Sequence, residues 1–399
     1  MRYKKFFADV FLNSVSNFIL VGIVQLVIFP FFNNYYGADS FGEITVVYGL
    51  NSIFLAFLGS SLNNVKIIHQ EKKGINFNAI SLVICCISFL TSIIIFRLYS
   101  STFSILEIII YSFTTSLGIF RIYLGALFRI RIEYKAILFD NLLVFMGYVL
   151  GLILFFIIHI WSLCFFIGEI IGVAYLVKKT KFFEQAFSLD KNKNVVLKDY
   201  FNLSFSYGVK SLSNYLDRLL IIPILGPVNM SIFYASNVLS KIIIMIIGQI
   251  NTVFLSYLMK GQRSLNKKRV VFLQILTLIG LGILFYPLTE VSKLAVKLLY
   301  PNFYEKAIQI IPYVTLGALF FCVNNIVKML MLKYYDTRNQ LYTQTVYTVI
   351  YILTAIYMSK NFGIEGFALA YLFMGVLLMV LYNGIILFGR PKTDENIEV

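Results

Sequence analysis

The chain has 399 residues, of which 59% are hydrophobic and only 13% are charged, and its mean hydropathy is +0.82. This composition excludes a soluble globular domain, and apolar runs of membrane-crossing length recur from end to end. The formal net charge of +15 comes from basic residues that lie mostly in short connections, where they act as topology determinants and not as a nucleic-acid surface. We therefore predict an all-α polytopic membrane protein, since such long continuous runs lack the alternation of a β-barrel.

Twelve membrane spans are predicted. In chain order they are 8–32, 39–62, 78–98, 105–128, 136–158, 161–177, 200–225, 229–258, 270–291, 306–331, 341–359 and 366–388. No small-x-small cleavage site follows the basic start of the chain, so the first span is expected to remain uncleaved. Spans five and six are joined only by His159 and Ile160, and small-xxx-small spacings at 147–151 and 168–172 predict that this hairpin packs closely.

The basic residues also predict the orientation of the chain. With the N-terminus inside, 24 of the 34 Lys and Arg residues fall on the inner side, five fall outside and five lie within spans. Cytoplasmic loops carry an excess of Lys and Arg, so both termini are expected in the cytoplasm. The five outside residues are Arg97, Lys293, Lys297, Lys306 and Lys360.

The chain is expected to divide at its longest polar connection. Segment 178–199 is predicted to be a cytoplasmic linker between an N-terminal six-helix bundle, 1–177, and a C-terminal six-helix bundle, 200–399. An even number of spans in each half requires that any internal repeat be parallel. The first span of each half ends in a Pro and then a Gly, Pro30 with Gly37 and Pro223 with Gly226, which favours a duplication.

The seventh span carries charge along its length. One helical face is predicted to hold Asn202, Ser206, Lys210, Ser213 and Asp217. An ionisable group at membrane depth is costly and must face protein, a partner or water. This span therefore predicts a polar cavity inside the membrane.

Five cationic residues lie at the predicted membrane depth, against three acidic ones, Asp217, Glu169 and Glu43. The excess predicts a cavity that attracts an anion. The candidate substrate-binding cations are Lys241, Lys210, Arg218, Arg121 and Lys328, of which Lys241 is the deepest. Neutral groups expected to line the cavity are Asn17, Gln25, Asn51, Asn237 and Asn324.

Structural alternatives exist for several of these residues. Arg121 and Lys328 lie toward the inner ends of their spans and could extend to the membrane surface. Lys210 and Asp217 are two turns apart and could form a structural pair. Glu169, beside two glycines of the hairpin, is favoured as an interhelical hydrogen-bond partner or counter-ion. Asp217 and Glu43 are candidates for a coupling site or for counter-ions.

No enzyme chemistry or cofactor is indicated. The four cysteines lie in apolar spans without metal-ligand spacing, and neither histidine has an acidic or cysteine companion, so no metal site is expected. No Walker motif is present, which argues against direct use of ATP. The longest outward loop, 292–305, is too short for a folded domain. The protein is therefore expected to be a transporter and not an enzyme.

Several short motifs occur in order along the chain. They are YGADSFG at 36–42, GP at 226–227 before FYA at 233–235, LYPNFY at 299–304 and GIEGFA at 363–368. Together with the six-plus-six layout, they resemble the multidrug/oligosaccharidyl-lipid/polysaccharide (MOP) exporter superfamily. Within it, the chain is most similar to the Wzx-type flippases of bacterial surface-polysaccharide assembly.

The resemblance implies a V-shaped pair of six-helix bundles around a cationic lumen, in the bacterial cytoplasmic (inner) membrane. It implies that the substrate is an undecaprenyl-pyrophosphate-linked oligosaccharide, the repeat unit of an O-antigen, capsule or exopolysaccharide. The substrate would move from the cytoplasmic to the outer leaflet by alternating access. A polysaccharide polymerase and a chain-length regulator are the partners this implies.

Two alternatives stay open. A drug or small-solute antiporter of the same fold would favour acidic cavity residues, which is the opposite of the balance here. A membrane polymerase or ligase for the same glycans would need a large outward loop, which the predicted topology lacks.

Overall fold

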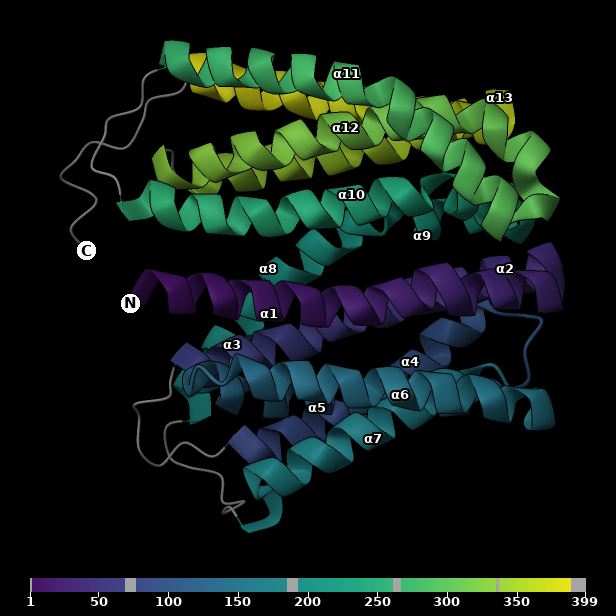
Figure 1. Ribbon diagram of the computed structural model, residues 1–399, viewed down its shortest axis with the longest axis vertical. Helices are drawn as coiled ribbons and strands as arrows, with labels where there is room; N and C mark the ends of the chain where they lie inside the picture. The colour runs from purple at the N-terminus through teal and green to yellow at the C-terminus, as the bar shows by residue number, and fades with distance from the viewer. Residues whose placement is uncertain (1, 69–76, 185–192, 261–266, 335–336, 389–399) are drawn as a thin grey trace. The chain divides into compact units, whose positions relative to one another are not determined.

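The computed structural model describes residues 2–68, 77–184, 193–260, 267–334 and 337–388. Every element within these ranges is a helix, as the sequence predicts (Figure 1). In chain order the elements are α1 (Arg2–Ile23), the π-helix η1 (Val24–Ile28), α2 (Phe29–Phe54), the π-helix η2 (Leu55–Ser60), α3 (Ser61–Ile68), α4 (Phe77–Tyr99), α5 (Ile105–Ile130), α6 (Tyr134–Ile158), α7 (Ser162–Thr180), the 3-10 helix η3 (Phe182–Glu184), α8 (Lys193–Asn214), α9 (Leu216–Leu225), α10 (Pro227–Lys260), α11 (Lys267–Leu299), the 3-10 helix η4 (Pro301–Phe303), α12 (Tyr304–Tyr334) and α13 (Thr337–Phe388).

Seven helical segments among the described residues are long and apolar enough to cross a membrane. Two of them, Ser14–Ile68 and Tyr342–Phe388, have 55 and 47 residues, whereas one crossing needs about 20. Each contains a glycine with positive φ, Gly37 at 78° and Gly363 at 60°, a conformation that glycine adopts without steric cost. These glycines lie between predicted spans one and two and between spans eleven and twelve. The protein is thus a multi-pass membrane protein, and the count of twelve spans stays a prediction.

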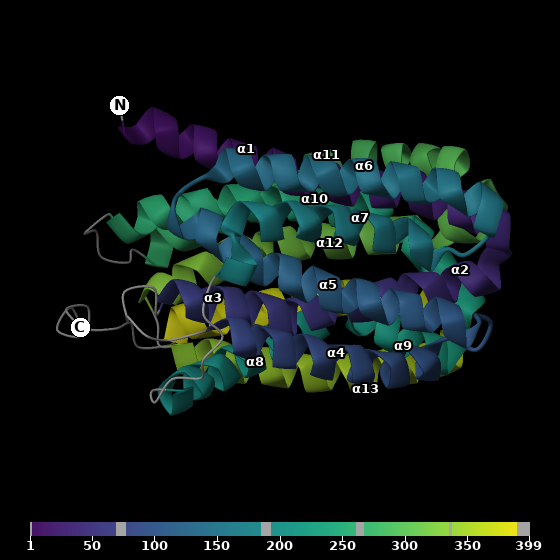
Figure 2. The ribbon, with the colours of Figure 1, turned by 90° about the horizontal axis from the view of Figure 1, so that it is seen from below.

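Helix packing divides the chain into two compact units, Met1–Leu219 (unit 1) and Leu220–Val399 (unit 2). In unit 1, α6 and α7 pack along each other, α5 packs on α7, α4 packs on α5, and α1 packs on α6 (Figure 2). In unit 2, α12 packs against α10, α11 and α13 (Figure 1). The bundle boundary predicted at 178–199 stays a prediction, whereas the packing boundary lies farther along the chain.

The predicted seventh span is two helices. Tyr215 interrupts it between α8 and α9, so it is not the single continuous helix that was expected. The face of α8 that packs within unit 1 carries the buried Tyr200, Ser204 and Gly208 at intervals of four residues. A Cβ added at Gly208 would lie 2.6 Å from the Phe57 ring, so this small face lets α8 approach η2 closely.

The hairpin of α6 and α7 packs with its backbones in contact, as its glycine spacing predicts. A Cβ added at Gly147 would lie 2.5 Å from the Cα atom of Gly168, and one at Gly151 would lie 2.6 Å from that of Cys164. The hairpin turns at His159, which has a left-handed backbone with φ 58°.

Three helix connections of unit 1 meet at one end. Glu43, just past the α2 glycine, accepts hydrogen bonds from the Ser100 and Ser101 hydroxyls, each at 3.0 Å, and from the Thr102 backbone N–H at 3.1 Å. Tyr35 OH lies 2.8 Å from His159 Nδ1 on the α6–α7 turn. The connections at 33–38, 98–105 and 159–160 therefore share an end, as alternating spans require.

The segment expected to be the longest outward loop, 292–305, is mostly helical. Helix α11 continues to Leu299, η4 follows at once, and α12 begins at Tyr304. The prediction of a loop there was wrong. Val296 and Phe303 of this segment are buried, so its packing extends the helices beyond the predicted span ends.

Candidate functional site

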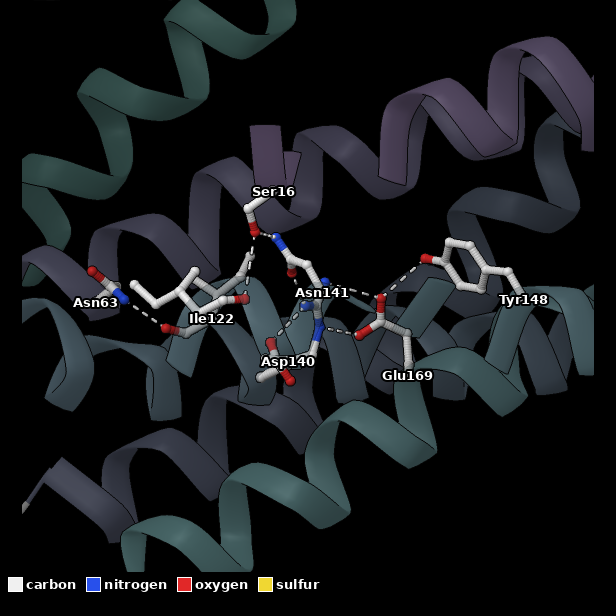
Figure 3. Close-up of polar contacts among 9 residues, drawn as sticks. Ser16, Asn63, Ile122, Asp140, Asn141, Tyr148 and Glu169 are labelled. Atoms are coloured by element: carbon white, nitrogen blue, oxygen red, sulfur yellow. Dashed lines mark hydrogen bonds and ion pairs between the residues drawn. The ribbon is translucent and has the colours of Figure 1, made fainter. Parts of the chain in front are cut away.

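A cluster of buried charges joins three helices of unit 1 around Arg121 on α5. The Arg121 guanidinium donates through Nε to Glu169 Oε2 on α7 at 2.7 Å, and through Nη1 to Asp140 Oδ2 on α6 at 2.9 Å. Nη1 also donates to the Asn141 side-chain oxygen at 2.9 Å. Figure 3 shows Asp140, Asn141 and Glu169 converging from two helices on this position.

The cluster extends to a fourth helix. The Asn141 amide donates to the Ser16 hydroxyl of α1 at 2.7 Å, and Tyr148 OH donates to Glu169 Oε1 at 3.3 Å (Figure 3). Gly172 on α7 leaves the space this requires, because a Cβ there would lie 2.8 Å from Arg121 Cδ. Together these residues form the Arg121 cluster, which fixes α1, α5, α6 and α7 relative to one another.

The Arg121 cluster corrects the charge balance expected from the sequence. Asp140 was not among the acidic residues placed at membrane depth, yet it and Glu169 are each only 5% exposed. One guanidinium faces two carboxylates, so Arg121 does not extend to the membrane surface, and Glu169 is the counter-ion that was favoured. Asp140, Val144, Gly147 and Gly151 recur at helical spacing, and this signal would have placed Asp140 on the buried face of α6.

Arg218 and Asp217 are both buried within unit 1, with exposed fractions of 3% and 4%. Arg218 on α9 donates to the Thr45 backbone carbonyl of α2 at 3.0 Å and lies over the Tyr215 ring, 5.1 Å from its centroid. It fits there because α2 has Gly49 at the contact, where a Cβ would meet Arg218 Cδ at 2.7 Å. The contact attaches α9 to α2.

The remaining predicted cations lie on long helices of unit 2 or outside the described side chains. Lys241 on α10 and Lys328 on α12 are both half-buried. The side chain of Lys210 lies outside the described residues. Whether these three groups bind a substrate stays a prediction.

The neutral groups predicted to line a cavity have varied surroundings. Asn17 is exposed, Gln25 is half-buried in η1, and Asn51 donates to Tyr111 OH at 3.5 Å. Asn324 donates to the Gly375 carbonyl at 2.8 Å between α12 and α13. Asn237 on α10 is 0% exposed, and neither polar atom of its side chain has a hydrogen-bond partner among the described residues.

The Glu43 carboxylate holds the loop at 100–102 in place. Its carboxylate, 5% exposed, is engaged by three donors from 100–102, as described above. Among the residues that the structure describes, no group of three or more His, Cys, Asp or Glu side chains could hold a metal ion.

The chain resembles known proteins in fold. No family model matches the chain, and no curated protein matches its sequence. Among solved structures, the chain is similar to the lipid II flippase MurJ in an inward closed conformation, with a TM-score of 0.74 and 16% identity over 94% of this chain and 87% of that one.

Transporters of other specificity share the architecture. An inward-facing multidrug resistance MATE family transporter of the MOP superfamily matches with a TM-score of 0.60 and 10% identity, over 97% of this chain and 96% of that one. A MOP superfamily transporter from Pyrococcus furiosus matches with a TM-score of 0.57 and 11% identity, over 96% and 94%. The chain therefore has the fold of the MOP superfamily transporters.

Proposed function

We propose that the protein is a flippase that moves an undecaprenyl-pyrophosphate-linked oligosaccharide from the cytoplasmic to the outer leaflet by alternating access. The observation that carries this proposal is the likeness to the lipid II flippase, whose TM-score of 0.74 exceeds the 0.60 and 0.57 of the other two transporters. The name of that protein states that it is a flippase of lipid II.

The residues assigned to the substrate are cations of the predicted membrane interior. Lys241 is the first candidate, followed by Lys210, Arg218 and Lys328, because ammonium and guanidinium groups complement a diphosphate. We assign Arg121 a structural role instead, since two carboxylates already hold its guanidinium. Of the two candidate coupling carboxylates we retain Asp217, because Glu43 is held by the loop at 100–102.

The proposal places the protein in the bacterial inner membrane with both termini in the cytoplasm. A polysaccharide polymerase and a chain-length regulator would act on the same glycan after translocation. The repeat unit would belong to an O-antigen, a capsule or an exopolysaccharide.

Surface polysaccharide in a cell that depends on this protein provides the test. Lys241→Ala and Lys210→Ala should each lower export at normal protein levels, while Lys135→Ala, an exposed lysine outside the predicted interior, should not. Unchanged export in both interior variants would contradict the assignment of these cations.

A second candidate function is small-solute antiport, which the likeness to MATE transporters favours. Resistance to cationic dyes on overexpression, without an effect on surface polysaccharide, would support it over the flippase. The polymerase alternative is not favoured, because the outward segment at 292–305 is taken up by α11, η4 and the start of α12.

A further inference from the structure

We propose that unit 1 binds the phosphate of a lipid headgroup at the end formed by α3 and the last turns of α5, through Lys66 and Arg129. This end is opposite to that of the three joined connections. Helix α5 starts at the connections and ends here, and the helical segment that leaves Gly37 runs through η2 and ends here as α3. It is the predicted cytoplasmic end. The site is separate from the interior cations assigned above.

Asn63 on α3 organises the site. Its side-chain N–H donates to the Ile122 backbone carbonyl of α5 at 2.5 Å, and its oxygen accepts from Arg129 Nη1 at 3.5 Å (Figure 3 shows the contact with Ile122). Asn63 is only 2% exposed, so its amide is fixed in orientation. It therefore draws the Arg129 guanidinium back along α5 toward α3. Among the described residues, the other N–H groups of that guanidinium have no hydrogen-bond acceptor.

Lys66 lies one turn after Asn63 on the same face of α3. Its Nζ lies 3.9 Å from the centroid of the Tyr123 ring, within the range of a cation–π contact. The ring is rigidly held, because Tyr123 is 0% exposed and its hydroxyl donates to Asn78. A ring face attracts the ammonium charge but accepts no strong hydrogen bond, so the Lys66 N–H groups stay available to an oxygen ligand.

The two cations are held by the same stretches of α3 and α5, since Arg129 contacts Asn63 and Lys66 lies over the ring of Tyr123, the residue after Ile122. Among the described residues, neither Lys66 nor Arg129 has a carboxylate within 4 Å, whereas Arg121 has two. Residues 63 and 66 are about 4.5 Å apart along α3 at helical rise, so the residue that contacts Arg129 and the residue that carries the ammonium lie one turn apart. An ammonium and a planar guanidinium at one helix end, without a carboxylate beside them, suit a phosphate group.

The surroundings favour a lipid as the source of that phosphate. The exposed Arg131 at the same end adds positive charge that attracts anionic headgroups to this surface. Lys66 lies four residues past the end of predicted span two, at the depth where headgroups meet the helix ends. The identification of the headgroup as the diphosphate of a carrier lipid rests on the proposed function, whereas phosphate binding itself does not.

Binding by the purified full-length protein tests the site. In neutral detergent, the protein is titrated with undecaprenyl diphosphate and, separately, with phosphatidylglycerol and inorganic pyrophosphate, and binding is followed by native mass spectrometry and by thermal stabilisation. The double variant Lys66→Gln/Arg129→Gln should bind the diphosphate at least about tenfold more weakly than the wild type, as expected for the loss of two charge-assisted contacts.

A matched control separates the site from general charge. Lys135→Gln/Lys178→Gln removes the same charge from exposed positions at the same end and should bind as the wild type does. The conservative pair Lys66→Arg/Arg129→Lys should retain most of the affinity and shows that the fold is intact. Equal weakening in the two Gln pairs, or no weakening in either, would overturn the proposal.

The three ligands distinguish the source of the phosphate. Preference for undecaprenyl diphosphate over phosphatidylglycerol supports a carrier site, whereas equal binding of the two contradicts that identity while supporting a general headgroup site. Lys66→Gln/Arg129→Gln could weaken the binding of all three ligands and leave polysaccharide export normal. That result would support the phosphate site and contradict a need for it in transport. If the wild type binds these ligands but neither the wild type nor any variant supports polysaccharide export, the proposed function alone is contradicted.

Discussion

The Arg121 cluster of unit 1 and Asn237 of unit 2 are buried in different ways. In unit 1, Arg121, Asp140, Asn141 and Glu169 hold one another from three helices, and Ser16 adds a fourth. In unit 2, Asn237 is just as buried, but neither of its side-chain atoms has a partner among the described residues. A buried network of charge-assisted hydrogen bonds fixes the packing of helices, whereas a buried amide without partners weakens the fold unless something else binds it. The difference indicates that the first group serves architecture.

The largest expected effect comes from removing the centre of the unit 1 cluster. Arg121→Gln leaves two buried carboxylates facing each other, and breaking a buried ion pair from one side costs about 3–5 kcal/mol. Thermal unfolding in detergent should show a large drop in Tm. Arg131→Gln, at an exposed position just past α5, is the control and should leave Tm unchanged.

A variant that also neutralises the carboxylates sharpens this result. Arg121→Gln/Asp140→Asn/Glu169→Gln should recover much of the lost stability, because no uncompensated charge is left. A drop in Tm as large as that of Arg121→Gln would show that the guanidinium stabilises the cluster through its packing more than through its charge.

The next effect concerns the link from the cluster to α1. Asn141→Ala removes the acceptor of Arg121 Nη1 and the donor to the Ser16 hydroxyl. These two buried groups then lack a hydrogen-bond partner, which should lower the free energy of unfolding by about 1–3 kcal/mol. The same unfolding measurement checks this, with Asn17→Ala, an exposed amide one residue from Ser16, as the control. Equal stability of the two variants would mean that α1 is held by apolar packing alone.

A smaller effect is expected at the joined connections. Glu43→Gln keeps an acceptor for the loop at 100–102 but loses the charge that strengthens its hydrogen bonds, so a cost of about 1 kcal/mol is expected. Polysaccharide export should continue, because the carboxylate anchors a loop. Loss of export at a normal Tm would instead favour a coupling role for Glu43.

The smallest effect on stability is expected in unit 2. Asn237→Leu replaces an unsatisfied buried amide by an apolar group of similar size, which should change the free energy of unfolding by less than about 1 kcal/mol or raise it. A large destabilisation would show that this amide is satisfied in the membrane, by bound water or by a ligand, and would remove the contrast between the units.

The sequence predicts the helical class and the approximate positions of the helices well, because hydropathy acts over long windows. The hairpin of α6 and α7 is likewise confirmed, since the spacing of Gly147 and Gly151 expresses a steric requirement that is local. The two π-helices and the interruption at Tyr215 carry no comparable local signal. They depend on contacts between distant segments, such as that of Gly208 with Phe57.

The candidate site is less predictable for the same reason. Helical depth identified Arg121 and Arg218 as unusual, but depth alone does not say what each side chain meets. Arg121 meets residues 19, 20 and 48 positions away in the chain, and Arg218 meets Thr45, 173 positions away. These pairings follow from tertiary packing. Asp140 was missed because it lies close to a predicted span end, where acidic residues are common.

The packing of α8 within unit 1 has a consequence for biosynthesis. As the chain emerges from the ribosome, a chain stopped at residue 199 lacks most of α8 and leaves the contacts of α3 and η2 with it unmade, although the polar segment 178–199 is complete. A chain stopped at 219 contains every segment of unit 1. Domains generally fold in the order of synthesis, so unit 1 can assemble only after most of the next predicted span, 200–225, has been synthesised.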